Sequence, residues 1–407
     1  MRDDDADVLV VGAGLAGLAC ARTLERAGLS VIVVEAAEEV GGRMRTDLVD
    51  GFLCDRGFQI VNPAYPALRR LVDLDALELH SFAAGVAVRH DRGLAVLADP
   101  RRQPRLLPAT LRSGYLDLGE LVALARWAAP ALRPSQLTRG PDTTLAASLD
   151  AAGVNGRLRR EVLEPFLAGV LADSSGQTSA AFVRLLVRCF LLGTPGVPAG
   201  GVQSLPRQIA AGLLEPVRCG VRVEAVSRGG RVDTDHGPLK APAVVVATDA
   251  VDALELVGVG SGTMRGLRTW WFAADQTPSP ERLIVVDGRR GPVVNTSVMS
   301  VAAPSYAPRG RALVQATTLL PSDLDEAGVR RELDRLWGTS TATWDLVVRH
   351  DIERSLPVQS APLPARRPVA LGAGLFVAGD HRDTASQQGA LVSGRRAARA
   401  VLAERRA

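Results

Sequence analysis

The chain has 407 residues, 47% of them hydrophobic and 40 of them glycine, which suits a globular α/β protein of about two or three domains. The formal charge of +4 is small for this length and only 4% of the residues are aromatic, so we expect no nucleic-acid partner. The four cysteines (Cys20, Cys54, Cys189 and Cys219) show no metal or redox spacing, so we predict no metal site and a reducing, cytoplasmic location.

The N-terminal residues Arg2–Asp5 are mostly acidic and run directly into an apolar segment, so we expect no signal peptide. No apolar run approaches the roughly 18 residues that a spanning helix needs. We therefore expect no spanning membrane segment, and at most a peripheral contact with a membrane surface.

The first elements are a strand, a glycine turn, a helix and a second strand. Residues 6–11 are an apolar run typical of a buried parallel strand, and GAGLAG at residues 12–17 gives the Gly-x-Gly-x-x-Gly pattern of a turn into a helix. The helix is predicted over Leu15–Ala27 and the second strand over Ser30–Val34. Glu35 ends that strand at about the spacing where a carboxylate takes up ribose hydroxyls and repels a 2′-phosphate. The stretch predicts a dinucleotide site that disfavours NADP.

A second glycine turn, Gly41-Gly42-Arg43, begins six residues after Glu35. Its amides and its guanidinium suit a pyrophosphate, so the turn can fold back over a bound dinucleotide. The alternative is an ordinary turn with a solvated arginine. Because this turn occurs together with the first glycine motif, we favour the interpretation that it binds a pyrophosphate.

Taken together, these motifs resemble the FAD-binding flavin amine oxidase superfamily, which also includes protoporphyrinogen oxidases and phytoene desaturase-like enzymes. Further segments extend the resemblance along almost the whole chain. Two other short segments resemble the desaturase-like branch most closely. The segments are DRGFQ at 55–59, GGVQSLP at 200–206, the strands at 221–227 and 243–249, and the C-terminal motif at 375–396. The two short segments that resemble the desaturase-like branch are TWWF at 269–272 and PSYAP at 304–308.

The resemblance implies an α/β chain, α+β overall, in which a Rossmann-like FAD-binding domain of the glutathione-reductase and amine-oxidase type carries an inserted substrate domain of antiparallel sheet plus helices. We expect the FAD-binding domain over residues 1–80, 200–257 and 356–407, and the substrate-binding domain over 81–199 and 258–355. Helices are predicted at Tyr65–Leu79, Leu116–Leu132, Leu145–Gly153, Arg157–Ala172, Ser179–Leu192 and Asp323–Trp337. Strands are predicted at Ala84–Val96 (a hairpin), Arg268–Ala273, Leu283–Val286, Val293–Met299, Leu313–Thr318 and Leu346–Ile352.

One of these helices, Leu116–Leu132, occupies a region where relatives carry membrane-attached helices. Glu120 and Arg126 lie inside it, which favours a core or cavity-wall helix over a membrane helix.

The C-terminal motif predicts the flavin half of the site. Leu375–Ala378 reads as a buried strand, and Asp380 follows it at the end where α/β proteins bind ligands. A helix over Gln388–Ala400 can point its N-terminal amides at the flavin. No cysteine occurs between residues 378 and 394, so the FAD that the resemblance implies is expected to be non-covalent. The cofactor-binding residues that it implies are Gly12, Gly14, Leu15, Ala16, Gly17, Glu35, Ala36, Gly41, Gly42, Arg43, Gly57, Phe58, Gln59, Val223, Thr248, Gly379, Asp380, Gln387, Gln388, Gly389 and Ala390.

Four residues are candidates for substrate binding, each with a structural alternative. The resemblance places Arg56 near the edge of the isoalloxazine, although it can equally belong to a turn. Trp270 and Trp271 are adjacent on a predicted strand and face opposite sides, so either one of them lines a cavity beside the flavin or both belong to the core. His381 is either a proton relay or a hydrogen-bonded structural residue. No residue is assigned a catalytic role.

Two parts that the resemblance implies for an amine oxidase are missing. They are a lysine that holds a water near flavin N5, and an aromatic pair that faces the flavin. Lys240 is the only lysine, it lies in a segment matched to the FAD-binding domain, and none of the three tyrosines lies in the C-terminal motif. Amine oxidation therefore becomes an alternative.

We expect an FAD-dependent oxidoreductase that transfers a hydride from a small hydrophobic substrate to flavin N5, by desaturation or dehydrogenation. Oxygen or a quinone is the expected electron acceptor. The alternatives are an amine oxidase with an altered active site, and a redox-neutral isomerase or non-catalytic flavin-binding protein.

Overall fold

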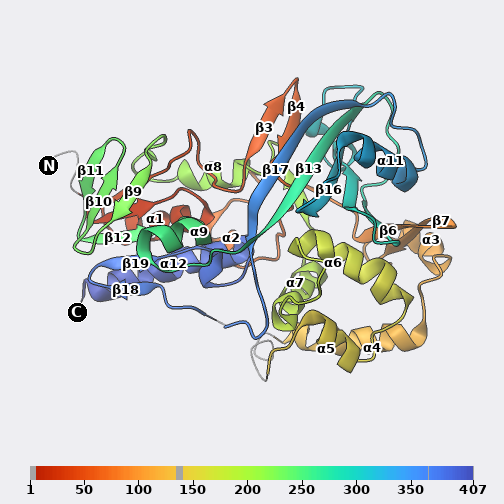
Figure 1. Ribbon diagram of the computed structural model, residues 1–407, viewed down its shortest axis with the longest axis horizontal. Coiled ribbons are helices and arrows are strands. Elements are labelled where there is room, and N and C mark those ends of the chain that lie inside the picture. The colour runs from red at the N-terminus through yellow and green to blue at the C-terminus, as the bar shows by residue number, and fades with distance from the viewer. Residues whose placement is uncertain (1–5, 134–140, 365, 407) are drawn as a thin grey trace.

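The computed structural model describes residues 6–133, 141–364 and 366–406, so the acidic segment Arg2–Asp5 lies outside the described residues. One part of the molecule is built on a largely parallel five-stranded sheet, and the other on a seven-stranded sheet with helices below it (Figure 1). The α/β class with a Rossmann-like unit and an inserted sheet-and-helix region is confirmed. The expected division at the five residue ranges given above stays a prediction.

The parallel sheet has the order β18-β19-β12-β1-β2. Its strands are β1 (Val8–Val11), β2 (Val31–Val34), β12 (Ala243–Val246), β18 (Ala370–Gly372) and β19 (Leu375–Val377). Apart from the antiparallel edge strand β18, the strands are parallel and consist of apolar, mostly β-branched residues, as expected for strands covered on both faces. Four distant segments of the chain therefore bring their carboxyl ends to one edge.

One face of this sheet is covered by α1 (Leu15–Glu25) and α12 (Gln387–Glu404), which pack closely through glycine. A Cβ on Gly394 would lie 2.0 Å from the Ala16 carbonyl oxygen, and a Cβ on Gly17 would lie 1.9 Å from the Gly12 carbonyl oxygen. Glycine at these two positions is therefore a steric requirement. The other face packs against a small sheet, β9 (Val223–Val226), β10 (Arg231–Thr234) and β11 (Gly237–Lys240), and against α9 (Ala250–Val257).

The larger sheet has the order β17-β13-β16-β15-β14-β6-β7. Its strands are β6 (Gly85–His90), β7 (Gly93–Ala98), β13 (Met264–Ala274), β14 (Ile284–Asp287), β15 (Val293–Val298), β16 (Ala312–Leu320) and β17 (Asp345–Pro357). The expected antiparallel arrangement holds except between β14 and β6, which run parallel with Ile284 opposite Val86. The β6–β7 hairpin thus joins strands that follow it by almost two hundred residues.

The expected helices of the inserted region are present. They are α4 (Leu118–Ala128), α5 (Leu145–Ala151), α6 (Glu164–Leu171), which a π-turn at Arg159–Leu163 precedes, α7 (Ala180–Leu192) and α11 (Glu326–Trp337). The remaining elements are β3 (Thr46–Val49), β4 (Phe52–Asp55), α2 (Leu68–Leu71), β5 (Leu79–Ser81), α3 (Leu107–Leu111), β8 (Gly196–Pro198), α8 (Ser204–Ala210) and α10 (Met299–Ala302), with short 3₁₀ turns at 104–106, 129–132, 304–306 and 380–382.

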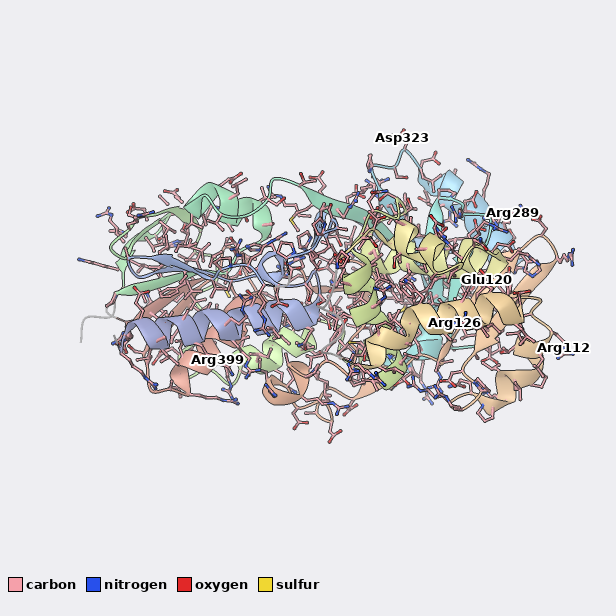
Figure 2. The ribbon with its side chains drawn as sticks, turned by 90° about the horizontal axis from the view of Figure 1, so that it is seen from below. Arg112, Glu120, Arg126, Arg289, Asp323 and Arg399 are labelled. Atoms are coloured by element: carbon pink, nitrogen blue, oxygen red, sulfur yellow. The ribbon has the colours of Figure 1, made fainter. Side chains whose placement is uncertain are left out.

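Two helix expectations need correction. Only α2 is helical within Tyr65–Leu79, because Val72 is extended and the Asp73 carboxylate accepts the Asp75 and Ala76 amides in a turn. Helix α4 does not line the cavity, but the core alternative holds for its inner face, where Trp127 is buried in a hydrophobic cluster. Its other face is at the surface, where Figure 2 shows Arg126. Glu120 is buried, and its carboxylate accepts the amides of Leu158 and Arg159, which offsets the cost of burying it. Among the helices of the described ranges, none is both long and apolar enough to cross a bilayer.

Candidate active site

A cavity of about 570 Å³ lies between the two sheets. At one end it is lined by the carboxyl ends of β1, β2, β12 and β19, which is where parallel α/β sheets bind ligands. At the other end it is lined by residues of α6, α7 and the large sheet. One continuous space therefore joins a dinucleotide-type strand edge to an apolar chamber.

The two glycine turns predicted from the sequence face each other at the strand edge. The Gly41 amide donates to the Ala13 carbonyl at 3.0 Å, and a Cβ on Gly42 would lie 3.2 Å from the Gly14 Cα. Helix α1 begins after Gly14, and no side chain caps its first amides in the described structure. Uncapped amides at a helix N-terminus beside a surface without Cβ atoms fit a pyrophosphate.

Glu35 ends β2 and lines the cavity. Its carboxylate accepts the Ala13 amide at 2.7 Å and the Ala37 amide at 3.0 Å, which fixes the side chain at the mouth of the first turn. The carboxylate is thus held where a ribose would follow the pyrophosphate. This donor and acceptor set fits the adenosine half of FAD.

Arg43 and Asp380 connect the N-terminal turn to the C-terminal motif. Arg43 Nη2 lies 2.7 Å from Asp380 Oδ1, and Arg43 Nη1 donates to the Ser355 carbonyl at 2.7 Å. Burial lowers the pKa of Arg43, but the adjacent Asp380 carboxylate outweighs burial and leaves that pKa above its ordinary value. Asp380 is itself buried, so the pair is a fixed charged element of the cavity wall.

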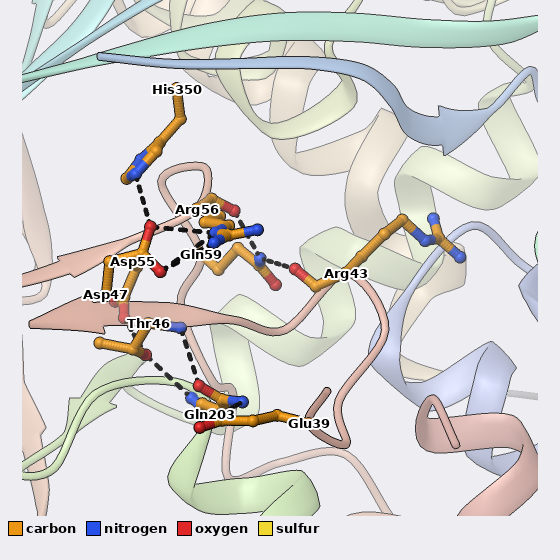
Figure 3. Close-up of polar contacts among 9 residues, drawn as sticks. All are labelled: Glu39, Arg43, Thr46, Asp47, Asp55, Arg56, Gln59, Gln203 and His350. Atoms are coloured by element: carbon orange, nitrogen blue, oxygen red, sulfur yellow. Dashed lines mark hydrogen bonds and ion pairs between the residues drawn. The ribbon is translucent and has the colours of Figure 1, made fainter. Parts of the chain in front are cut away.

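A second polar group surrounds Arg56 (Figure 3). Its guanidinium donates twice to Asp47, and His350 Nε2 lies 2.9 Å from the same carboxylate. Burial would raise the pKa of Asp47, but Arg56 and His350 hold it below its ordinary value. Gln59 Nε2 donates to the Arg43 carbonyl at 2.6 Å and to the Arg56 carbonyl at 3.0 Å, so the Gly41–Arg43 turn is tied to this group. Arg56 lines the cavity, as expected of it, and it is positioned by Asp47.

Asp55 lies beneath this group and is buried. Thr46 Oγ1, the Val202 amide and Tyr306 Oη donate to its carboxylate at 2.6, 3.1 and 2.8 Å, which joins β4 to two distant segments. Burial raises the pKa of Asp55 to about 6 despite these donors.

The apolar chamber is the part that the sequence did not predict. Its wall consists largely of side chains from the inserted segments: Phe166, Gly169, Val170, Leu186, Cys189, Phe190, Leu267, Ile284, Asn295 and Ile352. The strong apolar face of the expected helix 179–192 was the available signal for part of this set. None of the cavity-lining residues that lie within 81–199 and 258–355 is acidic.

Most of the expected cofactor residues line the cavity, but three do not. Gly17 packs against Gly12, Gly389 packs against the Thr384 carbonyl, and Gln388 Oε1 accepts the Ala67 amide at 2.9 Å. These positions shape the backbone around the cavity. Asn62 and Tyr65 line the cavity and were not expected to do so.

Three of the four substrate-binding expectations need correction. Trp270 and Trp271 are fully buried on opposite faces of β13, in different hydrophobic clusters, and neither lines the cavity. The core alternative therefore holds for both. His381 is also buried away from the cavity, and neither ring nitrogen has a hydrogen-bond partner among the described residues. Burial lowers the pKa of His381 to about 4, so its ring is neutral at pH 7.

The reactive side chains near the cavity are few. Lys240 lies on β11 and does not line the cavity. Cys189 does line it, but burial raises the pKa of its thiol to about 11, which keeps it protonated. Within the described ranges, no group of three or more His, Cys, Asp or Glu side chains could hold a metal ion.

The fold and this cavity together define a flavoprotein of the Rossmann type with an inserted apolar chamber. A model of the family of flavin containing amine oxidoreductases matches residues 15–402, so the chain belongs to that family. This membership confirms the expected class of FAD-dependent oxidoreductase, and the expectation of a non-covalent FAD stays a prediction.

Individual relatives differ in what they act on. The chain is 32% identical to a putrescine oxidase from Kocuria rosea over 232 residues, which cover 52% of this chain and only 47% of that protein. It is 28% identical to a hydroxysqualene dehydroxylase from Rhodopseudomonas palustris, over 98% of this chain and 99% of the relative. A candidate protoporphyrinogen oxidase from Exiguobacterium sp. 255-15 has the same fold, with a TM-score of 0.74 and 22% identity over 99% of this chain and 100% of that one.

Proposed function

We propose that the protein oxidises a hydrophobic organic substrate, by desaturation or dehydrogenation. When bound, FAD supplies the hydride acceptor, flavin N5. The observation that carries the proposal is the continuity of the glycine-lined strand edge with the apolar chamber. The substrate would lie in that chamber, where the surrounding side chains exclude water.

The residues that would hold FAD lie along the strand edge. The first turns of α1 and the Gly41–Arg43 turn would bind the pyrophosphate, and Glu35 would bind the ribose of the adenosine. Arg43 and Asp380 would lie beside the central part of the cofactor. Gln387 and Ala390, at the N-terminus of α12, would face the flavin, where the helix dipole favours negative charge.

Two features of the chamber support a hydrophobic substrate over an amine. Its wall lacks an acidic side chain within the described parts of 81–199 and 258–355, so a protonated amine would have no counter-ion there. The only lysine, Lys240, lies outside the cavity. The name of the relative that matches almost end to end also refers to an apolar substrate, hydroxysqualene.

Amine oxidation is kept as the second candidate because the putrescine oxidase match favours it. An anaerobic titration of the FAD-loaded protein with phytoene, protoporphyrinogen IX and putrescine distinguishes the two. We expect one of the apolar compounds to bleach the flavin absorbance and putrescine to leave it unchanged. Bleaching by putrescine alone would reverse the ranking, and substrate conversion without any bleaching would favour a redox-neutral isomerase.

A pair of variants tests whether the chamber is the substrate site. Val170 lines the cavity, whereas Leu214 is exposed and does not line it. Val170→Glu should abolish flavin reduction by the apolar compound while FAD remains bound, because it places a charge in the chamber. Leu214→Glu should leave reduction unchanged. Equal rates in both variants would contradict the placement.

A cytoplasmic location, a peripheral membrane contact and reoxidation by oxygen or a quinone complete the proposal. The contact is supported by exposed apolar side chains on and around α3 and α4, namely Leu111, Leu118, Val122 and Leu132. Flotation with liposomes tests it: we expect the wild type to float with the vesicles and Leu118→Ser to float less. A wild type that stays at the bottom of the gradient would contradict the contact.

A further inference from the structure

We propose that Asn295 donates a hydrogen bond to an oxygen atom of the substrate. The substrate would then be an apolar molecule that carries a hydrogen-bond acceptor, such as a ketone, ether or hydroxyl oxygen, where it meets β15. This inference rests on the proposed function, because it takes the apolar chamber as the substrate site.

Asn295 is a polar residue in an otherwise apolar part of the wall. It lies on β15, lines the cavity and is only 5% exposed. Its Oδ1 accepts Gln315 Nε2 at 3.1 Å, and Thr317 Oγ1 donates to Gln315 Oε1 at 3.1 Å. Gln315 and Thr317 are both buried on the neighbouring strand β16.

One end of the Asn295 amide is free in this row of hydrogen bonds. The Thr317 hydroxyl donates to Gln315 Oε1, and Gln315 Nε2 donates to Asn295 Oδ1. Asn295 accepts this hydrogen bond with its Oδ1, and its Nδ2 has no acceptor among the described residues. The buried row thus orients a donor instead of an acceptor.

Gly169 on α6 provides the room for this donor. A Cβ on Gly169 would lie 2.2 Å from Asn295 Nδ2, so any side chain at this position would collide with the amide. Glycine inside a helix costs roughly 0.5–1 kcal/mol relative to alanine. Its presence in α6, next to the free amide, leaves the amide space that any other residue would occupy.

A free donor in an apolar chamber has a direct consequence for specificity. A ligand that covers this donor without accepting from it leaves the donor unpaired, which costs about 1–3 kcal/mol, whereas a substrate oxygen would accept its hydrogen bond and avoid that cost. A hydrocarbon of the same shape would leave it in place, so it should bind more weakly. A protonated amine, which can only donate, would gain nothing at Asn295.

Two isosteric ligands test the inference by calorimetric binding to the FAD-loaded protein. The ligands are 2-undecanone and 2-methyl-1-undecene, in which a methylene group replaces the carbonyl oxygen. We expect the ratio of the two dissociation constants to favour the ketone by about tenfold more in the wild type than in Asn295→Leu. Comparing the ratio between proteins cancels the different hydration of the two ligands.

Two further variants keep the test decisive. Asn295→Asp retains an acceptor for Gln315 but loses the donor, so it should lose the ketone preference even if Asn295→Leu fails to fold. Asn62→Leu removes the other asparagine of the cavity wall and should retain the preference. A ketone preference that is lost in Asn62→Leu but kept in the Asn295 variants would overturn the assignment.

The outcomes also separate this inference from the proposed function. If both ligands bind and the Asn295 variants leave the ratio unchanged, only the role of Asn295 is wrong. If neither ligand binds the wild type, the hydrophobic substrate site is wrong, and the role of Asn295 falls with it.

Discussion

Arg43 and Asp380 form an ion pair of 2.7 Å between residues more than three hundred positions apart. The pair joins the second glycine turn to the C-terminal motif at the wall of the cavity. It therefore holds together the two halves of the cofactor site, which come from opposite ends of the chain.

Removing one member of this pair should cost more than removing both. Arg43→Met leaves the buried Asp380 carboxylate without its counter-ion, which should lower the free energy of unfolding by about 3 kcal/mol. Arg43→Met with Asp380→Asn should recover part of that loss, because no buried charge remains unpaired. Denaturant unfolding at pH 7 measures both. An additive double variant would show that the two side chains are not coupled.

Two glycines of the first motif should respond differently to a methyl group. A Cβ on Gly14 would meet no described atom closer than 3.9 Å, whereas one on Gly17 would lie 1.9 Å from the Gly12 carbonyl oxygen. Gly14→Ala should therefore fold but lose FAD affinity by about tenfold or more, because its methyl group enters the cavity. Gly17→Ala should lose about 3 kcal/mol of stability through overpacking. Thermal unfolding and FAD titration separate the two effects. A Gly14→Ala protein with unchanged FAD affinity would contradict the placement of the pyrophosphate against the two glycine turns.

Asp55 should make stability depend on pH. Its folded pKa of about 6 lies above the ordinary value of 3.8, so the folded protein favours the protonated carboxyl. The stability that this provides is complete below pH 3.8 and is lost as the pH rises through 6, by up to about 3 kcal/mol. Asp55→Asn should lack this component, so its stability relative to the wild type should increase between pH 4 and pH 7. Parallel pH curves of unfolding free energy would contradict the burial of a titrating carboxyl.

His381 should affect stability in acid and leave catalysis unchanged. Its pKa is lowered from 6.5 to about 4, so the neutral ring stabilises the folded protein above pH 6.5 and that contribution is lost as the pH falls through 4. His381→Gln should remove up to about 3 kcal/mol of this acid-side loss. The pH profile of kcat/KM should be the same in the variant and the wild type. A profile that loses an ionisation would restore the proton-relay hypothesis.

The cofactor half of the cavity could be predicted because its parts are local. A glycine turn, a strand-end carboxylate such as Glu35 and the Gly41–Arg43 turn each need only a few consecutive residues, and parallel strands bring their ends together by topology. Their contacts with one another, such as the Arg43 pair with Asp380, are not local and emerged only in the structure.

The substrate half could not be predicted for the same reason. Asn295, Gly169 and Leu267 come from three distant segments, and no spacing in the sequence marks them as neighbours. Adjacent tryptophans on a strand show only that the two side chains face opposite sides. Both faces of β13 are covered, by different hydrophobic clusters, and this places Trp270 and Trp271 in the core.

The parallel pairing of β6 with β14 has a consequence for how the protein is made. The β6–β7 hairpin leaves the ribosome long before its partner strand has been synthesised, so one of its edges has no neighbour during that interval. An unpaired edge strand is a template for strands of other nascent chains. We therefore expect the yield of folded protein to depend on chaperone supply and on low expression temperature more than on the stability of the finished molecule.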